Sequence, residues 1–198
     1  MTDRLLKVDY ANMNGLDDKT QILFKQLEWG INLNSNTMYL TYEIDTDQLY
    51  AVTTRFDNFI QYTKAKRDVN LVISSYGGDV YSMLGTIDYF NSLPVKVNTH
   101  CVGACMSAAA VILACGTGKR TMSENSTVMV HEGSAFEAGK TSDVLKGADH
   151  LKKLQSNINR ILGEVTNKDQ EFWEEVSKQD TYLTSDQCLE YGIVDEIT

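Results

Sequence analysis

Short apolar segments alternate with longer segments of helical periodicity from residue 37 to the end of the chain. The first 36 residues have a weaker pattern, with one amphipathic segment from Asp17 to Trp29. We predict a helix for that segment, because its apolar residues recur at a helical spacing. The pattern divides the chain into a divergent N-terminal segment, 1–36, and a folded domain, 37–198.

Turn and capping residues separate the elements predicted within the folded domain. Gly77-Gly78 marks a turn between a buried strand and a helix, and Pro94 ends that helix. Asn167 is expected to cap one later helix, and Thr184 with Gln187 has the spacing of a capping box for the last one. Strands are expected at 38–44, 70–75, 95–102, 119–122 and 126–130 and at the C-terminus, and helices at 46–65, 79–92, 107–115, 141–166, 167–177 and 184–191.

The alternation of strands and helices predicts an α/β domain with largely parallel strands. In such domains, active sites favour the loops at the carboxyl ends of the strands. The predicted helix at 141–166 carries an apolar stripe, which either packs against its own domain or forms a contact between subunits. The stripe comprises Val144, Leu145, Ala148, Leu151, Leu154, Ile158, Ile161, Leu162 and Val165.

Composition narrows the classes of protein that fit the chain. Its 198 residues, 42% of them hydrophobic, are enough to bury the core of one soluble domain. A formal net charge of −9 argues against nucleic acid as a partner, because phosphates would be repelled. The sequence lacks an apolar run of about 18 residues, so no membrane span is expected. The N-terminus also lacks the apolar core of a secretion signal.

The four cysteines are Cys101, Cys105, Cys115 and Cys188. Three of them cluster around one predicted strand–helix unit, which is typical of buried, reduced thiols in a cytosolic protein rather than of a disulfide framework. His100 is adjacent to Cys101, but neighbours on a strand point to opposite faces and are poorly placed to share a metal ion. We therefore expect a cytoplasmic protein that has no cofactor or metal of its own.

Ser107, His131 and Asp180 are the strongest candidates for chemistry. Ser107 follows Gly103-Ala104-Cys105-Met106, where a strand gives way to an alanine-rich helix whose unpaired N–H groups would stabilise negative charge. His131 ends the apolar strand Thr127-Val128-Met129-Val130, and an imidazole can act as a base near neutral pH. A serine nucleophile needs such a base, and the base needs an anionic partner such as Asp180.

Simpler interpretations exist for each of these residues. A serine at the start of a helix is often only an N-cap, and a histidine at the end of a strand is often a polar boundary residue. Asp180 is one of 27 acidic residues, and Asp186 and Asp195 are its nearest rivals. We interpret the other two histidines, His100 and His150, as structural or surface residues.

Taken together and in this order, the motifs resemble the ClpP family, the proteolytic subunit of the Clp protease. The matching segments are Ser74-Ser75-Tyr76-Gly77-Gly78, the segment around Ser107, Val128-Met129-Val130-His131, Asp180-Thr181-Tyr182-Leu183-Thr184 and Glu190-Tyr191-Gly192-Ile193-Val194-Asp195. The resemblance extends from about Met38 to the C-terminus without evident insertions. It implies a ClpP/crotonase-like fold, a repeated β-β-α spiral with a protruding handle formed by the helix at 141–166.

The resemblance also implies roles for individual residues. Ser107, His131 and Asp180 would be the catalytic triad of a serine endopeptidase that works through an acyl-enzyme intermediate. The backbone N–H groups of Gly78 and Ala108 would form the oxyanion hole. The residues around Ser107 do not follow the pattern Gly-x-Ser-x-Gly, so the strained turn of the α/β-hydrolases is not expected.

The partners implied by the resemblance are copies of the same chain, stacked as two heptameric rings that enclose peptides or unfolded proteins. A Clp-type AAA+ ATPase, which alone would use ATP, or another ClpP-like subunit would join them. The positions of the family's apolar ATPase-docking pocket fall here at Asn70, Val72, Ser92, His100, Val102, Thr121 and Ser123. Most of these residues are polar, so we expect weak docking of a usual Clp ATPase. Three alternatives remain open. Mixed rings could supply intact pockets, a dedicated partner could have a more polar loop, or Phe90 or Met122 could refill the pocket.

Two other classes of function remain open from the sequence. A catalytically silent ring subunit would serve an active one, although such subunits usually lack members of the triad. An acyl-CoA enzyme of the crotonase type shares the fold and the backbone oxyanion hole, but it uses carboxylates near a thioester.

Overall fold

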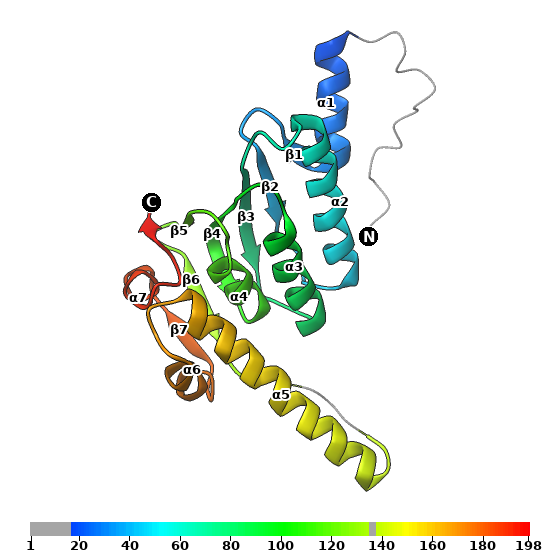
Figure 1. The fold of residues 1–198 in the computed structure, drawn as a ribbon. Helices are drawn as coiled ribbons and strands as arrows, with labels where there is room; N and C mark the ends of the chain where they lie inside the picture. The colour runs from blue at the N-terminus through cyan, green and yellow to red at the C-terminus, as the bar shows by residue number, and fades with distance from the viewer. Residues whose placement is uncertain (1–16, 135–137) are drawn as a thin grey trace.

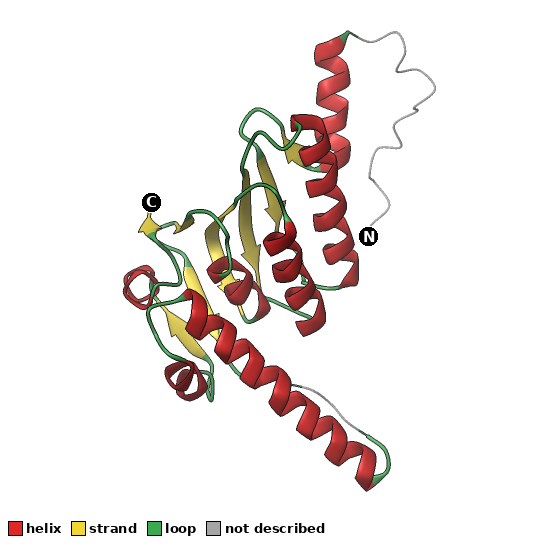
Figure 2. Ribbon diagram, viewed as in Figure 1, coloured by secondary structure: helices red, strands yellow, loops and turns green. Residues whose placement is uncertain are grey.

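The computed structural model describes residues 17–134 and 138–198. One sheet carries helices on one side, and a long helix leaves the body of the domain (Figure 1, Figure 2). The helices are α1 (Asp18–Trp29), α2 (Thr46–Thr63), α3 (Val80–Ser92), α4 (Ala108–Ala114), α5 (Thr141–Val165), α6 (Gln170–Val176) and α7 (Ser185–Tyr191). The strands are β1 (Ile31–Asn32), β2 (Thr37–Leu40), β3 (Val69–Ser75), β4 (Val97–Met106), β5 (Arg120–Met122), β6 (Thr127–Val130), β7 (Thr181–Leu183) and β8 (Glu196–Ile197).

The sheet is mainly parallel and divides at β4. Its order is β1-β2-β3-β4-β5-β8, and β6 and β7 form a second branch. The first half of β4 pairs with β5 through Thr99–Cys101, whereas the second half pairs with β6 through Ala104–Met106. The pairs β1–β2 and β6–β7 are antiparallel, and the remaining pairs are parallel. The predicted α/β class, with largely parallel strands, is therefore confirmed.

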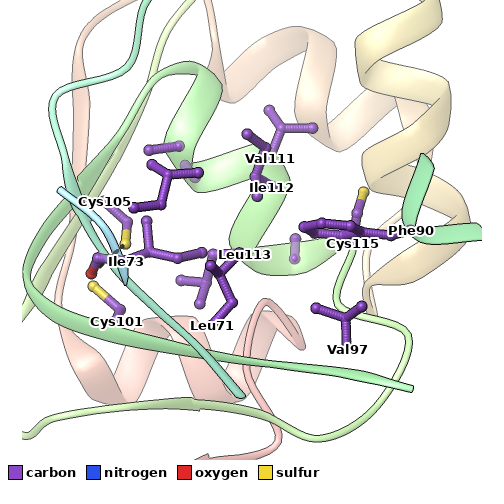
Figure 3. Close-up of a cluster of buried hydrophobic side chains, with 14 of the residues drawn as sticks. Leu71, Ile73, Phe90, Val97, Cys101, Cys105, Val111, Ile112, Leu113 and Cys115 are labelled. Atoms are coloured by element: carbon purple, nitrogen blue, oxygen red, sulfur yellow. Dashed lines mark hydrogen bonds between the residues drawn. The ribbon is translucent and has the colours of Figure 1, made fainter. Parts of the chain in front are cut away.

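Alternating burial along β3 explains how the sheet holds its helices. Val69, Leu71 and Ile73 are fully buried, while the residues between them face the other side of the sheet. All seven residues of α4 are buried, and Figure 3 shows Leu71 and Ile73 beside Val111–Leu113 of that helix. Each large apolar side chain removed from water in this way contributes about 1.5–3 kcal/mol. This layer holds the end of β4, and hence Ser107, in a fixed position.

Three predicted boundaries were wrong. The strand predicted at 95–102 runs from Val97 to Met106, because its second half pairs with β6. The other two were wrong for reasons that involve distant residues. The strand predicted at 38–44 ends at Leu40, because Ile44 instead exchanges backbone hydrogen bonds with Gly77 and Asp79. Asp169, not Asn167, caps α6. The backbone N–H of Asn167 donates to the carbonyl of Tyr191, and its side chain donates to the carbonyl of Glu190, so Asn167 binds the C-terminal end of α7.

The helix α5 has two different halves. Near its C-terminal end, Leu162 is buried and the helix packs against α4 and α6. Its N-terminal half projects from the body of the domain (Figure 1). Leu145 in that half is 66% exposed, and Ala148 is exposed as well. Packing within the domain therefore accounts for only part of the apolar stripe.

The four cysteines are buried and free, so the structure contains no disulfide. Phe90 and Met122 are also buried in the core, so neither refills a pocket on the surface. On the side of the sheet opposite α4, His100 Nδ1 lies 2.7 Å from Thr121 Oγ1 and its Nε2 lies 3.3 Å from Ser123 Oγ. Burial lowers the pKa of His100. Its contacts with Thr121 and Ser123 agree with the interpretation of this histidine as structural.

Candidate active site

The topology of the sheet brings the three candidate residues to one edge. Ser107 follows β4 and His131 follows β6, and these two strands are parallel neighbours whose carboxyl ends coincide. Asp180 precedes β7, which runs antiparallel to β6 with Val130 opposite Thr181. This register places Asp180 across from His131.

The side chains form a continuous chain of contacts. His131 Nε2 lies 2.9 Å from Ser107 Oγ, and His131 Nδ1 lies 3.2 Å from Asp180 Oδ1. The imidazole is 29% exposed and the carboxylate 63% exposed. The rival Asp195 instead accepts hydrogen bonds from Arg120, and Asp186 lies in the first turn of α7. The structure therefore selects Asp180 among the three carboxylates as the neighbour of His131.

Ser107 has a strained backbone, which contradicts the expectation from its flanking sequence. Its φ of 54° and ψ of −123° lie in a region that residues with a Cβ rarely adopt. The N–H of Ser107 donates to the carbonyl of Met129, while its own carbonyl accepts the N–H of Ala110 as α4 begins. The chain thus changes from sheet pairing to helix within one residue. Strain of this kind costs about 1–3 kcal/mol and is concentrated at functional sites.

Gly77 packs against this turn and Gly78 packs against Ile44, and no larger residue fits at either position. A Cβ on Gly77, whose φ is +100°, would lie 2.7 Å from Met106 O and 2.8 Å from Ser107 Cβ. A Cβ on Gly78 would lie 2.1 Å from Ile44 O. Within the described residues, the backbone N–H groups of Gly78 and Ala108 donate no hydrogen bond. Both groups are therefore available as donors beside Ser107.

A cavity of about 550 Å³ opens at Ser107 and extends toward α5 and α6. Ser107, His131, Gly78 and Ala108 line it, whereas Asp180 is not among the lining residues. Much of the remaining wall is apolar, with Met83, Val111, Leu154, Ile158, Leu162 and Trp173. This volume falls in the range of ordinary ligand pockets.

The cavity also involves residues that sequence analysis did not assign to a site. His150 was interpreted as structural or surface, and it is exposed, but it lines the cavity. Its Nε2 lies 2.8 Å from the hydroxyl of Tyr81, and the two rings are stacked. This contact joins α3 to α5 across 69 positions of sequence, so no local pattern could have revealed it.

No helix in the described part of the chain is both long and apolar enough to cross a membrane. Among residues 17–134 and 138–198, no group of three or more His, Cys, Asp or Glu side chains is arranged to bind a metal ion.

Comparison with known proteins places the sequence of this chain in a family. The sequence model of the Clp protease family matches residues 26–198. The ATP-dependent Clp protease proteolytic subunit 1 of Prochlorococcus marinus is 34% identical over 138 residues, which cover 69% of this chain and 71% of that protein. The proteolytic subunit 2 of Frankia casuarinae is 34% identical over 140 residues, which cover 70% of this chain and 64% of that protein. The chain therefore belongs to the Clp protease family, whose proteolytic subunits are serine-type peptidases.

Proposed function

We propose that this chain is a serine endopeptidase of the Clp type, which cleaves peptides or unfolded proteins with Ser107, His131 and Asp180 as its catalytic triad. The observation that carries the proposal is the contact chain of 2.9 Å and 3.2 Å from Ser107 Oγ through His131 to Asp180 Oδ1. The family match and the cavity at Ser107 support it.

In the proposed reaction, His131 Nε2 accepts the proton of Ser107 as Oγ attacks the carbonyl carbon of the scissile bond. The carbonyl oxygen becomes an oxyanion, to which the N–H groups of Gly78 and Ala108 donate hydrogen bonds. The imidazolium then gives its proton to the leaving amine, and an acyl-enzyme remains. A water molecule, deprotonated by His131, hydrolyses the acyl-enzyme. Asp180 keeps the imidazole oriented and stabilises its charged form throughout.

The crotonase-type alternative has less support from the cavity. Asp79 is the one carboxylate among the described residues that line it. That carboxylate accepts hydrogen bonds from the N–H and the hydroxyl of Ser82, and it caps α3. A carboxylate committed to a helix cap is poorly suited to act on a thioester. A catalytically silent subunit would usually lack members of the triad. Here all three side chains are present and in contact, which gives that alternative no support.

Oligomeric assembly belongs to the same proposal, in the form of stacked heptameric rings. The exposed apolar residues on the projecting half of α5, among them Leu145 and Ala148, are the surface that would join two rings. Rings of this kind would enclose the cavities, so that only small or unfolded chains reach Ser107. A monomer in light scattering at micromolar concentration would contradict this part of the proposal.

A Clp-type ATPase is the proposed partner for unfolding substrates, but its docking surface here is polar. His100, Thr121 and Ser123 form one hydrogen-bonded group on the face of the sheet away from α4. Asn98 donates to Asn70 on the same face. An apolar loop from an ATPase would find little apolar area to bury there.

A fluorophosphonate probe with a fluorescent label tests the proposed chemistry directly. We expect the probe to modify the wild-type protein at Ser107 alone, and Ser107→Ala to lose both labelling and peptide hydrolysis, by a factor on the order of 10⁶. Ser142→Ala, which changes an exposed serine at the start of α5, is the matched control and should behave as the wild type. Undiminished hydrolysis by Ser107→Ala would refute the assignment.

A further inference from the structure

On the α5–α6 side of the cavity lie two buried polar side chains. Each of them has one polar atom without a hydrogen-bond partner among the described residues. Asn159 is 2% exposed and Ser177 is 5% exposed, and both line the cavity. Within the described residues, Asn159 Nδ2 and Ser177 Oγ make no hydrogen bond, although Asn159 Oδ1 accepts one from Gln155. A polar side chain that is buried to this extent usually has a hydrogen-bond partner for each of its polar atoms, because little water reaches it.

These two atoms face the cavity rather than the packed core. Among the described residues, the one fully enclosed side-chain nitrogen or oxygen without a partner is Gln48 Nε2. Asn159 Nδ2 and Ser177 Oγ therefore keep some accessible surface, and the cavity is the space that their residues line. A molecule in the cavity can reach both.

The orientation of the Asn159 amide is set by its neighbour. Gln155 Nε2 donates to Asn159 Oδ1 at 2.9 Å, while Gln155 Oε1 accepts the N–H of Gly133, also at 2.9 Å. With its oxygen engaged, Asn159 offers the cavity two N–H donors, and Ser177 offers a hydroxyl that can donate or accept. A carboxamide has the matching groups, because its oxygen accepts and its nitrogen donates.

We propose that this cavity binds the side chain of the substrate residue whose carbonyl carbon Ser107 attacks, and that its polar wall recognises glutamine. The inference rests on the proposed peptidase function. The methylene groups of glutamine suit the apolar wall formed by Val111, Leu154 and Ile158. Glutamate is a poorer fit, because no lysine or arginine lines the cavity within the described part of the chain, and the histidines that do, His131 and His150, already contact Ser107 and Tyr81. A carboxylate would lose its hydration there.

The test compares peptides with a C-terminal aminomethylcoumarin leaving group that differ only in their last residue, which is glutamine, methionine or glutamate. In the variants Asn159→Leu and Ser177→Ala, we expect the ratio of kcat/KM for glutamine over methionine to fall about three- to tenfold, the range for one lost hydrogen bond. Asn157→Leu, the same substitution two positions away and outside the cavity lining, should leave the ratio unchanged. The wild type should also cleave after glutamine faster than after glutamate.

Two results would overturn the inference: an unchanged ratio in both variants, which includes an equal loss of rate on glutamine and methionine peptides, or faster cleavage after glutamate by the wild type. Ser177→Ala removes one oxygen atom and serves if Asn159→Leu does not fold. Fluorophosphonate labelling separates this inference from the proposed function. A wild-type protein that is not labelled would end both, whereas labelled variants with an unchanged ratio would end only the assignment of glutamine.

Discussion

Gly77→Ala is the substitution through which the geometry of the site can be tested most directly. The added methyl group would lie 2.7 Å from Met106 O and 2.8 Å from Ser107 Cβ, and both distances are shorter than nonbonded contacts allow. Because the neighbours are the main chain and the Cβ of the turn itself, neither can rotate away. The turn that carries Ser107 must therefore move by a few tenths of an ångström.

Two effects of different size follow. The φ of +100° at Gly77 is unfavourable for alanine by about 1–2 kcal/mol, and the displaced turn adds to that loss of stability. A misplacement of 1 Å at a catalytic site can lower the rate about 10²-fold, so a smaller shift should lower kcat/KM about tenfold. The loss of activity should therefore exceed what the unfolded fraction alone explains.

Gly103→Ala provides the control. Gly103 also has a positive φ, +75°, but the nearest atom to its added Cβ is Ser74 Oγ at 3.4 Å. We expect this variant to lose stability through the backbone while it keeps the activity of its folded fraction. Urea unfolding and the rate of fluorophosphonate labelling measure the two effects separately. Labelling of folded Gly77→Ala at the wild-type rate would show that the contact between Gly77 and Ser107 does not position the nucleophile.

Three further predictions follow from other contacts. Asp180→Asn should lower kcat/KM by up to about 10⁴-fold with little change in stability, because the carboxylate orients His131 but is largely exposed; kinetics and thermal unfolding check this. Arg120→Ala should lower the free energy of unfolding at pH 7 by about 2 kcal/mol, because Arg120 donates to the carbonyls of Ala114 and Val165 and to Asp195. Burial opposes the shift, but the hydrogen bonds and charge of Arg120 prevail and lower the pKa of Asp195. The stability contributed by this pair is therefore present above about pH 4 and is lost as the pH falls through the folded-state pKa, while the hydrogen bonds of Arg120 to the two carbonyls remain. A difference between wild type and Arg120→Ala that does not become smaller as the pH falls below about 4 would contradict this. Docking of a bacterial Clp ATPase to the homo-oligomer should be weak or absent in a pull-down, and submicromolar binding would show that the polar group around His100 does not prevent it.

Local signals in the sequence determined the elements and the order of the motifs. Thr184 and Gln187 form the predicted capping box, and Gly192 ends α7 in a left-handed conformation. The helix predicted from Asp17 to Trp29 occupies Asp18–Trp29, with Asp17 as its cap. These features depend on residues three or four positions apart, so their physics is contained in a short segment. The boundary predicted between 1–36 and 37–198 stays a prediction, and residues 1–16 lie outside the described part of the chain.

The sequence also named Ser107, His131 and Asp180, but only through resemblance could it choose Asp180 among the acidic residues. The tertiary structure shows that Asp180 is the carboxylate next to His131, because the register of β6 and β7 places Thr181 opposite Val130. It also decided the strained φ of Ser107, which depends on the hydrogen bond to Met129 and on the close approach of Gly77.

The polar wall of the cavity could not be predicted from the sequence. Asn159 and Ser177 belong to no motif, and each would pass for an ordinary helix residue. What distinguishes them is that both side chains are nearly buried, while one polar atom of each has no partner among the described residues and both residues line the cavity. Burial and hydrogen bonding are set by contacts among residues far apart in the chain. A single sequence encodes those contacts only through the fold as a whole.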